Sequence, residues 1–267
     1  MCSRKWNLER LWMILLPHCE TNITTACQCK CVACTQMVGT LKPSFVEPES
    51  VERDLHIFRE VAHVEKYAIL GGEPTLHKRL VDILHIVRAS GIADEIEVWT
   101  NGMSLRRQPP EFWESFDTLF LSLYPGKVSD EDVLWIRNKC IETGRNLEVK
   151  DARVTSYFSA LLTREHGSPQ EAAHRYKFCW FKKWTRALNN GYFYRCCTSV
   201  FIPRVVMNQP EGTDALSLDG ITEQKLQAFL DQAETPLSCF RCTSMRGPTI
   251  EWREAGEDTW LTESTIP

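Results

Sequence analysis

Short apolar runs recur along the chain, separated by segments with a different periodicity. Each run is rich in aliphatic, β-branched or aromatic residues and is followed by turn-forming or polar residues, which favours a buried strand over a helix. The strands predicted in this way are residues 11–17, Tyr67–Leu70, Ile96–Trp99, Thr118–Leu123 and Leu147–Val149. Most of the intervals between them leave room for one helix.

Apolar residues in these intervals recur every three or four positions, as on the buried face of an amphipathic helix. The predicted helices are residues 50–62, 80–90 and Asp130–Thr143. Ser50 is the expected cap of the first helix, and Gly91 and Gly144 are expected to end the other two. Alternating strands and helices predict an α/β fold with a parallel sheet or barrel, in which the functional loops follow the carboxyl ends of the strands.

Composition narrows the class of protein. The 267 residues are 43% hydrophobic, enough to bury a full core as one barrel-like domain with a small appendage. A formal net charge of −4 argues against nucleic acid or an anionic membrane as the main partner, so a small molecule is expected.

The apolar run at residues 11–17 lacks the small-residue cleavage site of a signal peptide, and no run approaches the length of a membrane span. The chain is therefore expected to be cytoplasmic. In that compartment its 12 cysteines favour metal or redox chemistry over disulfides.

Three motifs follow predicted strands and should face one mouth of the barrel. A cysteine-rich loop at 27–37 follows the first strand, Gly71-Gly-Glu-Pro74 follows the second, and Thr100-Asn-Gly102 follows the third. Taken singly, such segments are also ordinary turns or zinc ligands. Their shared position at one edge favours a common site.

Cys27, Cys31 and Cys34 form the pattern C-x3-C-x2-C. Three thiolates can bind three irons of a [4Fe–4S] cluster and leave the fourth iron open, whereas structural zinc prefers four protein ligands. With Gly-Gly-Glu-Pro downstream, the pattern resembles the radical S-adenosylmethionine (SAM) enzymes over roughly residues 11–155. The resemblance implies a partial (β/α)6 TIM-like barrel.

The resemblance also implies the chemistry. The open iron chelates the amino and carboxylate groups of SAM, and an electron donor such as flavodoxin or ferredoxin reduces the cluster. SAM is then cleaved to a 5′-deoxyadenosyl radical that abstracts hydrogen from the substrate. The residues implied in SAM binding are Gly71, Gly72, Glu73 and Pro74 at the amino group, and Asn101 and Ser122 at the ribose or carboxylate.

Some residues near the motifs have less defined roles. Lys150, Asp151 and Arg153 are placed to meet a polar substrate or the SAM carboxylate, or form a solvated rim. Ala33 replaces the aromatic residue that usually precedes the third cysteine in the family. The additional Cys29 is interpreted as a bystander, because taking it as a ligand gives spacings that fit the family poorly.

A second group of cysteines lies beyond the barrel: Cys179, Cys196, Cys197, Cys239 and Cys242. The segment before Cys196 predicts two strands about an Asn-Gly turn, and strand alternation lets only one of Cys196 and Cys197 point inward. Cys197 is selected as that residue. A C-x17-C spacing followed by a distant C-x2-C pair then resembles the twitch domain, a shortened SPASM-type domain.

That resemblance implies a second, auxiliary [4Fe–4S] cluster on Cys179, Cys197, Cys239 and Cys242, with a zinc ribbon as the alternative. Chain length and ligand layout are similar to those of 2-deoxy-scyllo-inosamine dehydrogenases. The expected domains are a core barrel at 1–155 and a linker with a twitch-type domain at 156–267.

The resemblance leaves two outcomes for a substrate radical. Loss of an electron to the second cluster gives oxidation, whereas return of a hydrogen atom from a thiol gives epimerisation; Cys196 and Cys140 are the spare thiols. Only 26 residues precede Cys27, too few for the separate leader-peptide recognition domain of many peptide-modifying relatives. This favours a small molecule, such as a sugar-like or aminocyclitol-like metabolite of natural product biosynthesis, over a ribosomal peptide. A zinc-stabilised interaction protein is the alternative of another class, and His166 and His174 are expected to be structural or exposed.

Overall fold

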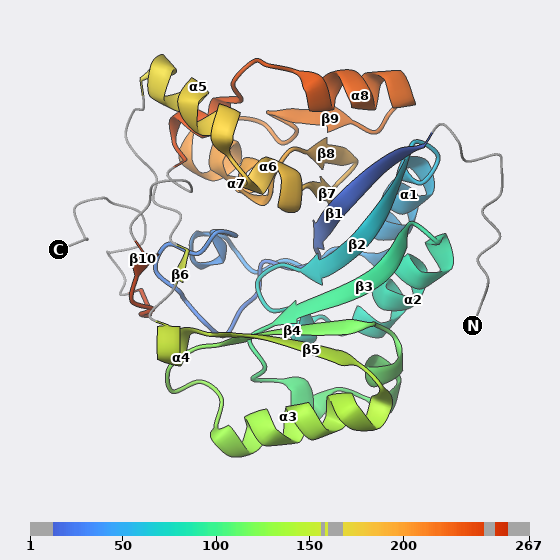
Figure 1. Cartoon of the computed structure of the whole chain (residues 1–267), viewed down its shortest axis with the longest axis vertical. Helices are drawn as coiled ribbons and strands as arrows, with labels where there is room; N and C mark the ends of the chain where they lie inside the picture. Colours follow the sequence, from blue (N-terminus) through green and yellow to red (C-terminus); the bar gives the residue numbers. More distant parts are fainter. Residues whose placement is uncertain (1–12, 156–157, 160–167, 243–248, 256–267) are drawn as a thin grey trace.

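The computed structural model describes residues 13–155, 158–159, 168–242 and 249–255. Eight strands form one sheet in the order β5-β4-β3-β2-β1-β7-β8-β9. Their bounds are Ile14–Asn22 (β1), Ala62–Leu70 (β2), Ala93–Thr100 (β3), Thr118–Leu123 (β4), Asn146–Asp151 (β5), Ala187–Asn189 (β7), Tyr192–Tyr194 (β8) and Ala215–Ser217 (β9). The strands β1 to β5 are parallel and twist into an open half-barrel (Figure 1).

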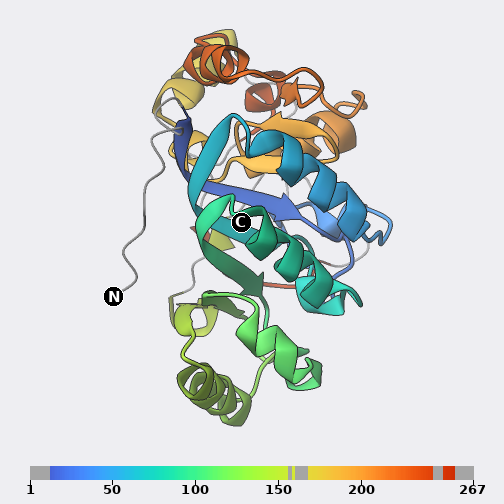
Figure 2. The same cartoon turned by 90° about the vertical axis from the view of Figure 1, so that its right-hand side faces the viewer.

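Helices between the parallel strands cover the outer face of this half-barrel. They are Pro48–Phe58 (α1), Leu80–Ser90 (α2) and Asp130–Thr143 (α3), and Figure 2 shows α1 and α2 side by side over the sheet. Apolar residues at helical spacing, such as Leu55, Phe58 and Leu84, are fully buried against the strands. Burial of this stripe is the main source of stability for helices of such length.

The second half of the chain extends the same sheet on the other side of β1. Strand β7 pairs parallel to β1 at Glu20 and Ala187, and β8 and β9 follow antiparallel. The predicted Asn-Gly hairpin is present, with φ 48° at Asn190 and 79° at Gly191, as a two-residue turn requires. Because the sheet is continuous, the two halves share a core.

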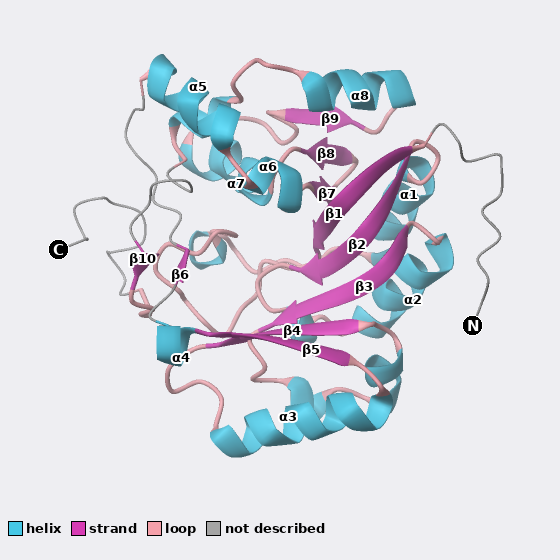
Figure 3. Ribbon diagram, in the orientation of Figure 1, coloured by secondary structure: helices cyan, strands magenta, loops and turns pink. Residues whose placement is uncertain are grey.

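The remaining helices stand around β7–β9 and beside the barrel mouth (Figure 3). They are Ala152–Thr155 (α4), Pro169–Phe178 (α5), Phe181–Trp184 (α6), Cys197–Val206 (α7) and Glu223–Asp231 (α8). Short 3-10 helices lie at Val38–Thr40 (η2), Pro74–Leu76 (η3), Leu105–Arg107 (η4), Pro110–Glu114 (η5) and Leu237–Phe240 (η6). The expected domain boundary after 155 falls next to residues outside the described part, so the division at 155 stays a prediction.

Several predicted elements differ at their ends: β2, β3 and β5 are longer than predicted, and the first strand and first helix are shifted. The first strand begins at Ile14 and continues to Asn22, beyond the predicted end at residue 17, and residues 11–12 lie outside the described part. Helix α1 begins at Pro48 after Glu47 instead of at Ser50, because proline fits the first helical position. The helix ends at Phe58, so Ala62 belongs to β2 and not to the helix.

The described C-terminal segment returns to the barrel mouth. Thr249–Ile250 (β10) pairs antiparallel with Phe158–Ser159 (β6), and Glu254 forms an antiparallel bridge with Cys31. This segment therefore lies along the cysteine loop. Among the described residues, no helix has the length and hydropathy needed to cross a bilayer.

Candidate active site

A cavity of about 490 Å³ opens at the carboxyl ends of the parallel strands. The sulfur-bearing residues of the cysteine loop line one side, and Trp180, Phe181 and Trp184 of the second half line another. The floor consists of alternate residues on the inner face of the sheet, namely His18, Glu20, Glu97, Trp99, Phe120, Ser122, Glu148 and Lys150. The cavity thus joins both halves of the chain.

The cysteine loop brings Cys27, Cys31 and Cys34 together at the cavity wall, as predicted. Cys29 belongs to the same group: its backbone N–H donates to Cys27 Sγ at 3.4 Å, and its own sulfur lies 3.7 Å from Met103 Sδ. Contact with the Cys29 thiol, and then burial, raises the pKa of Cys27. The structure therefore places four thiols where the motif needs three.

Gly71 and Gly72 lie against the chain that leads into Cys27. The Gly72 N–H donates to Thr24 O at 2.7 Å, and a Cβ at Gly72 would come within 2.2 Å of Ala26 O and 3.2 Å of Cys27 Cβ. At Gly71, where φ is 145°, a Cβ would lie 2.5 Å from Thr24 O. Only glycine permits this close approach, and both glycines line the cavity.

Glu73, unlike Gly71 and Gly72, lies behind the cavity wall. It is fully buried and does not line the cavity, and its carboxylate accepts hydrogen bonds from both the backbone and the hydroxyl of Thr75, from Thr100 Oγ1 at 2.6 Å and from Asn101 N at 2.7 Å. The carboxylate therefore ties the loop after β2 to the loop after β3. Pro74 begins the short helix η3 and is likewise buried away from the cavity lining.

Asn101 and Ser122 line the cavity, whereas Arg153 does not. Asn101 Nδ2 donates to Gln28 Oε1 at 3.2 Å and lies 3.8 Å from the sulfurs of Cys27 and Cys29. Arg153 is exposed and forms ion pairs at 2.8 Å with Asp130 and with Asp151. His174 is exposed, as expected, and His166 lies outside the described residues.

The cavity floor includes polar residues that belong to none of the sequence motifs. His18, Glu20 and Glu97 are 6%, 2% and 3% exposed, and Glu20 Oε1 has no hydrogen-bond partner among the described residues. Burial raises the pKa of Glu20 to about 8, against the opposing effect of the Gln36 amide. The signal was available in the sequence, because polar residues alternate on one face of an otherwise apolar strand.

Glu97 differs from Glu20 because it is fully paired. Its carboxylate accepts from Lys66 Nζ at 3.0 Å and from Trp99 Nε1 at 2.7 Å, and His18 Nε2 lies 3.7 Å away. Burial opposes ionisation, but these donors prevail and lower the pKa of Glu97 to about 2. Burial thus favours the protonated form of Glu20, whereas the donors around Glu97 favour its ionised form.

A second thiol group forms where α5, α7 and η6 meet. It comprises Cys179, Cys196, Cys239 and Cys242: burial raises the pKa of Cys239, and the other three thiols, which lie close by, raise it further. Thr198 Oγ1 lies 3.3 Å from Cys196 Sγ and 4.0 Å from Cys242 Sγ, between the two. Cys196 thus lies with the other three, and Cys197, whose pKa the nearby thiols of Cys196 and Cys242 also raise, lies next to this group.

Cys197 instead lines the cavity and is 4% exposed. Its N–H donates to Thr185 Oγ1 at 3.3 Å, and burial followed by the charge of nearby Glu20 raises its pKa. Strand alternation selected Cys197 as the inward thiol, but β8 ends at Tyr194 and Cys197 begins α7. The two cysteines lie at a strand-to-helix junction, where alternation does not apply.

Cys140, the other spare thiol, is not brought to the cavity. It is 1% exposed on α3 and packs in the main hydrophobic core with Ile136 and Trp113. In the part of the chain that the structure describes, no three Cys, His, Asp or Glu side chains are arranged to bind one single metal ion. A four-iron cluster needs a different arrangement, because each of its protein ligands binds a separate iron.

The chain was compared with protein-family models and with curated proteins. No protein-family model matches the chain. The GTP 3′,8-cyclase of Pectobacterium atrosepticum is 32% identical over 94 residues, 34% of this chain and 28% of that protein. The enzyme of the same name from Actinobacillus pleuropneumoniae is 25% identical over 169 residues, 57% of this chain and 46% of that protein. The chain thus spans less than half the length of these curated relatives.

Solved structures match over more of the chain. BtrN in complex with AdoMet (SAM) and 2-DOIA has a TM-score of 0.52 at 11% identity, covering 82% of this chain and 84% of BtrN. The structure of anSMEcpe with bound AdoMet has a TM-score of 0.54 at 14% identity, covering 92% of both chains. The chain has the radical SAM fold. The resemblance predicted from the cysteine and glycine motifs is confirmed, as is an α/β fold of the partial TIM-like barrel type.

The residues present fit the cofactors that the radical SAM fold implies. Cys27, Cys31 and Cys34, together with Cys29, border the cavity, and the adjacent Gly71–Gly72 backbone leaves no space for a side chain at the point where it meets Cys27. Thiolates are the usual protein ligands of [4Fe–4S] clusters. The twitch-type domain and its second cluster stay predictions.

Proposed function

We propose that the protein is a radical SAM enzyme that acts on a small polar metabolite by epimerisation or oxidation. The observation that carries the proposal is the meeting of the cysteine loop, the glycine segment and a polar floor in one cavity. Cys27, Cys31 and Cys34 would hold a [4Fe–4S] cluster. SAM bound there supplies the 5′-deoxyadenosyl radical.

The backbone at Gly71 and Gly72 is suited to approach the amino group of SAM. Asn101 and Ser122 line the same cavity and can donate to its ribose or carboxylate. Glu73 supports this site indirectly, because its hydrogen bonds to Thr100 and Asn101 fix the two loops relative to each other. Flavodoxin or ferredoxin in the cytoplasm would supply the electron.

The residues of the cavity floor support the proposed substrate class. Glu20, Glu148, His18 and Lys150 offer donors and acceptors, and Trp99 and Phe120 form an apolar wall with stacked rings 4.3 Å apart. Such a surface suits the hydroxyl and amino groups of a sugar or aminocyclitol. BtrN was solved with 2-DOIA and anSMEcpe with the Kp18Cys peptide, so modification of a peptide is the second candidate.

The second thiol group would hold an auxiliary [4Fe–4S] cluster, with Cys196 in the place first given to Cys197. This revision follows the grouping of Cys196 with Cys179, Cys239 and Cys242. It leaves Cys197 as a free thiol in the cavity beside Glu20. A thiol in that position favours epimerisation, because an S–H bond can return a hydrogen atom to a carbon radical.

In an epimerisation, a substrate carbon would lose a hydrogen atom to the radical that SAM supplies. The Cys197 S–H bond would then break as a new C–H bond forms on the other face of that carbon. One electron from a donor protein of the flavodoxin or ferredoxin class and one proton, through Glu20, would restore the thiol, so that each turnover would consume one SAM and two electrons.

The test of the basic activity needs no substrate. Anaerobically reconstituted protein with dithionite and SAM should form 5′-deoxyadenosine and methionine, and colourless zinc-loaded protein without SAM cleavage would overturn the proposal in favour of a zinc-stabilised interaction protein. A panel of hexosamines, aminocyclitols and short peptides, scored by stimulation of 5′-deoxyadenosine formation, would then identify the substrate class.

The outcome of the reaction is tested in D2O with the best compound of that panel. Epimerisation predicts one solvent deuterium in the product, with incorporation at least tenfold lower in Cys197→Ser while 5′-deoxyadenosine still forms. Cys140→Ser is the matched control, since that thiol is buried in the core. An oxidised product without solvent deuterium would instead favour oxidation, with the second cluster as electron acceptor.

A further inference from the structure

Trp252 in the C-terminal segment donates its indole N–H to the sulfur of Cys31 at 3.1 Å. Indole nitrogen is only a donor, and a neutral thiol is a weak acceptor. The hydrogen bond gains strength when the sulfur carries negative charge, as it does on iron. The pairing is therefore better suited to a ligated thiolate than to a free thiol.

The position of Trp252 is fixed by its neighbours on the chain. On one side of the cysteine, Val32 N donates to Arg253 O at 3.0 Å, and on the other Ala255 N donates to Lys30 O at 2.7 Å. These two bonds bracket Cys31 and form the antiparallel bridge between Cys31 and Glu254. The C-terminal segment thus acts as a short extra strand along the cysteine loop.

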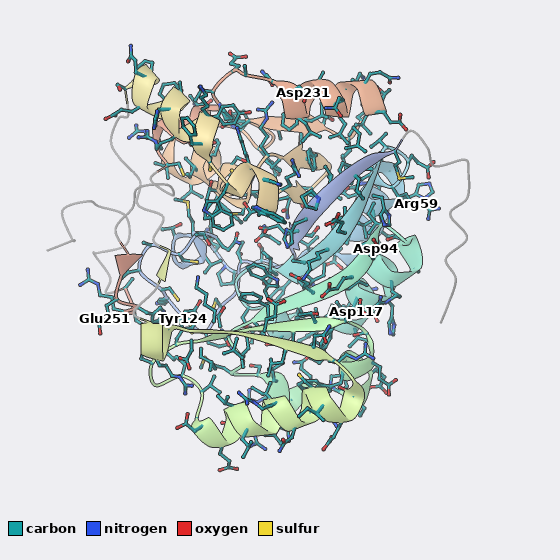
Figure 4. The ribbon with its side chains drawn as sticks, viewed as in Figure 1. Arg59, Asp94, Asp117, Tyr124, Asp231 and Glu251 are labelled. Atoms are coloured by element: carbon teal, nitrogen blue, oxygen red, sulfur yellow. The ribbon has the colours of Figure 1, made fainter. Side chains whose placement is uncertain are left out.

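Side chains that follow β4 also hold the indole ring of Trp252. It stacks on Tyr124 with ring centroids 5.2 Å apart and planes 21° from parallel, and Tyr124 lies at the end of β4. Lys127 Nζ lies 5.7 Å from the centre of the indole ring and pairs with Glu254 at 2.6 Å. In the view of Figure 4, Tyr124 and Glu251, the residue that precedes Trp252, are labelled on the same side of the molecule.

We infer that Trp252 is a positioning residue that tunes the reduction potential of the cluster at Cys27, Cys31 and Cys34. The inference rests on the proposed function. An N–H···S hydrogen bond stabilises the more negative, reduced cluster, so it raises the potential and eases the reduction that precedes SAM cleavage. A segment more than 200 residues from the motif thereby contributes to radical initiation.

The test is an anaerobic redox titration followed by EPR, on the cluster whose signal changes when SAM is added. Trp252→Phe keeps the ring on Tyr124 and removes the donor. We expect its reduction equilibrium to be less favourable by about tenfold, a lowering of roughly 59 mV for one electron. Trp135→Phe on α3 removes an indole N–H away from the cavity and should leave the potential unchanged.

A change of less than twofold in the equilibrium, or a rise in potential, would overturn the inference. If the variant fails to retain the cluster, the unmodified protein gives the answer. Protein labelled with nitrogen-15 only at its tryptophan indoles should show a nitrogen-15 coupling in pulsed EPR of the reduced, SAM-responsive cluster, and absence of that coupling contradicts the inference. Absence of any SAM-responsive cluster would instead contradict the proposed function.

Discussion

The two thiol groups of this protein differ in how they are built. Cys27, Cys31 and Cys34 come from one loop between β1 and α1, within eight residues of sequence. Cys179, Cys196, Cys239 and Cys242 come from the end of α5, the start of α7, and η6 with the residue pair that follows it. The first group depends on local chain geometry, whereas the second depends on tertiary packing.

The two groups also differ in the number of thiols available to bind iron. Three protein thiols leave one iron of a four-iron cluster open to a cofactor, and four close it. The first group lies in the cavity wall beside the glycine segment, but the second is displaced from the cavity, with only the neighbouring Cys197 lining it. One site is suited to start a radical reaction and the other to exchange electrons or to stabilise the fold.

The largest expected effect comes from the first group. Cys31→Ala removes a ligand and should lower 5′-deoxyadenosine formation at least a hundredfold, whereas Cys29→Ala should keep most of the activity. The two variants differ by two positions in one loop and form a matched pair. The measurement is chromatography of the products from SAM and dithionite.

An equal loss in both variants would show that Cys29 takes part in the cluster. The structure makes this a demanding test, because Cys29 lies among the other thiols and is 1% exposed. Iron content separates a lost ligand from a misfolded loop: Cys29→Ala should retain the full iron content of the unmodified protein.

The second expected effect distinguishes the neighbouring cysteines. Reconstituted protein should carry about eight irons per chain, and Cys196→Ala should lose about four of them because the closed site loses a ligand. Cys197→Ala should keep all eight. Iron and sulfide analysis after gel filtration gives the result, and near-ultraviolet circular dichroism shows whether each variant is folded.

The reverse pattern, with iron lost only in Cys197→Ala, would restore the ligand set first predicted from the strand alternation. About four irons in the unmodified protein, with no further loss in either variant, would leave the second group without a cluster. In that case the four thiols would have only a packing role in the second half of the chain.

Sequence could predict the elements whose signals are local. Helix α3 has the predicted bounds because Ser129 caps it and Gly144, at φ 67°, ends it, and β4 has its predicted ends as well. The cysteine loop and the glycine segment were found from their spacing and their place after strands, and their roles were implied by the resemblance to the radical SAM enzymes. Each of these features depends on residues within one short segment.

Features that depend on packing could not be predicted. The positions of Cys196 and Cys197 are set by the start of α7, and the contact of Trp252 with Cys31 joins residues 221 positions apart. The resemblance assigned Glu73 to SAM binding, but its buried carboxylate accepts hydrogen bonds from Thr75, Thr100 and Asn101. No single segment contains the information for these contacts.

A third expected effect concerns the double variant Cys239→Ala with Cys242→Ala. If the first group alone holds the SAM-binding cluster, as proposed, the folded variant should still form 5′-deoxyadenosine but should lose at least tenfold in product. Product and 5′-deoxyadenosine are measured in the same reaction. A variant that forms product at the full rate would show that the second group is not needed for turnover.

The smallest expected effect is at Glu20, in the cavity beside Cys197. Its pKa is raised by burial to about 8 from 4.5, so between these values the folded protein keeps a proton that the unfolded chain has lost. Stability should therefore fall as pH rises from 4.5 to 8. Glu20→Gln removes the titration and should stabilise the protein at pH 7.5 by on the order of 2 kcal/mol, or roughly 4–8 °C in melting temperature.

The pH dependence separates this effect from a simple packing change. The gain in melting temperature should shrink as the pH approaches 4.5, where Glu20 is protonated in both states. Glu97→Gln is the matched control with the opposite sign. The pKa of Glu97 is lowered to about 2 by its interactions with His18, Trp99 and Lys66, so loss of the carboxylate should destabilise the protein at neutral pH. A gain from Glu20→Gln that is the same at pH 5 and pH 8 would mean that Glu20 is ionised in the folded protein, and proton delivery to Cys197 would then need another group.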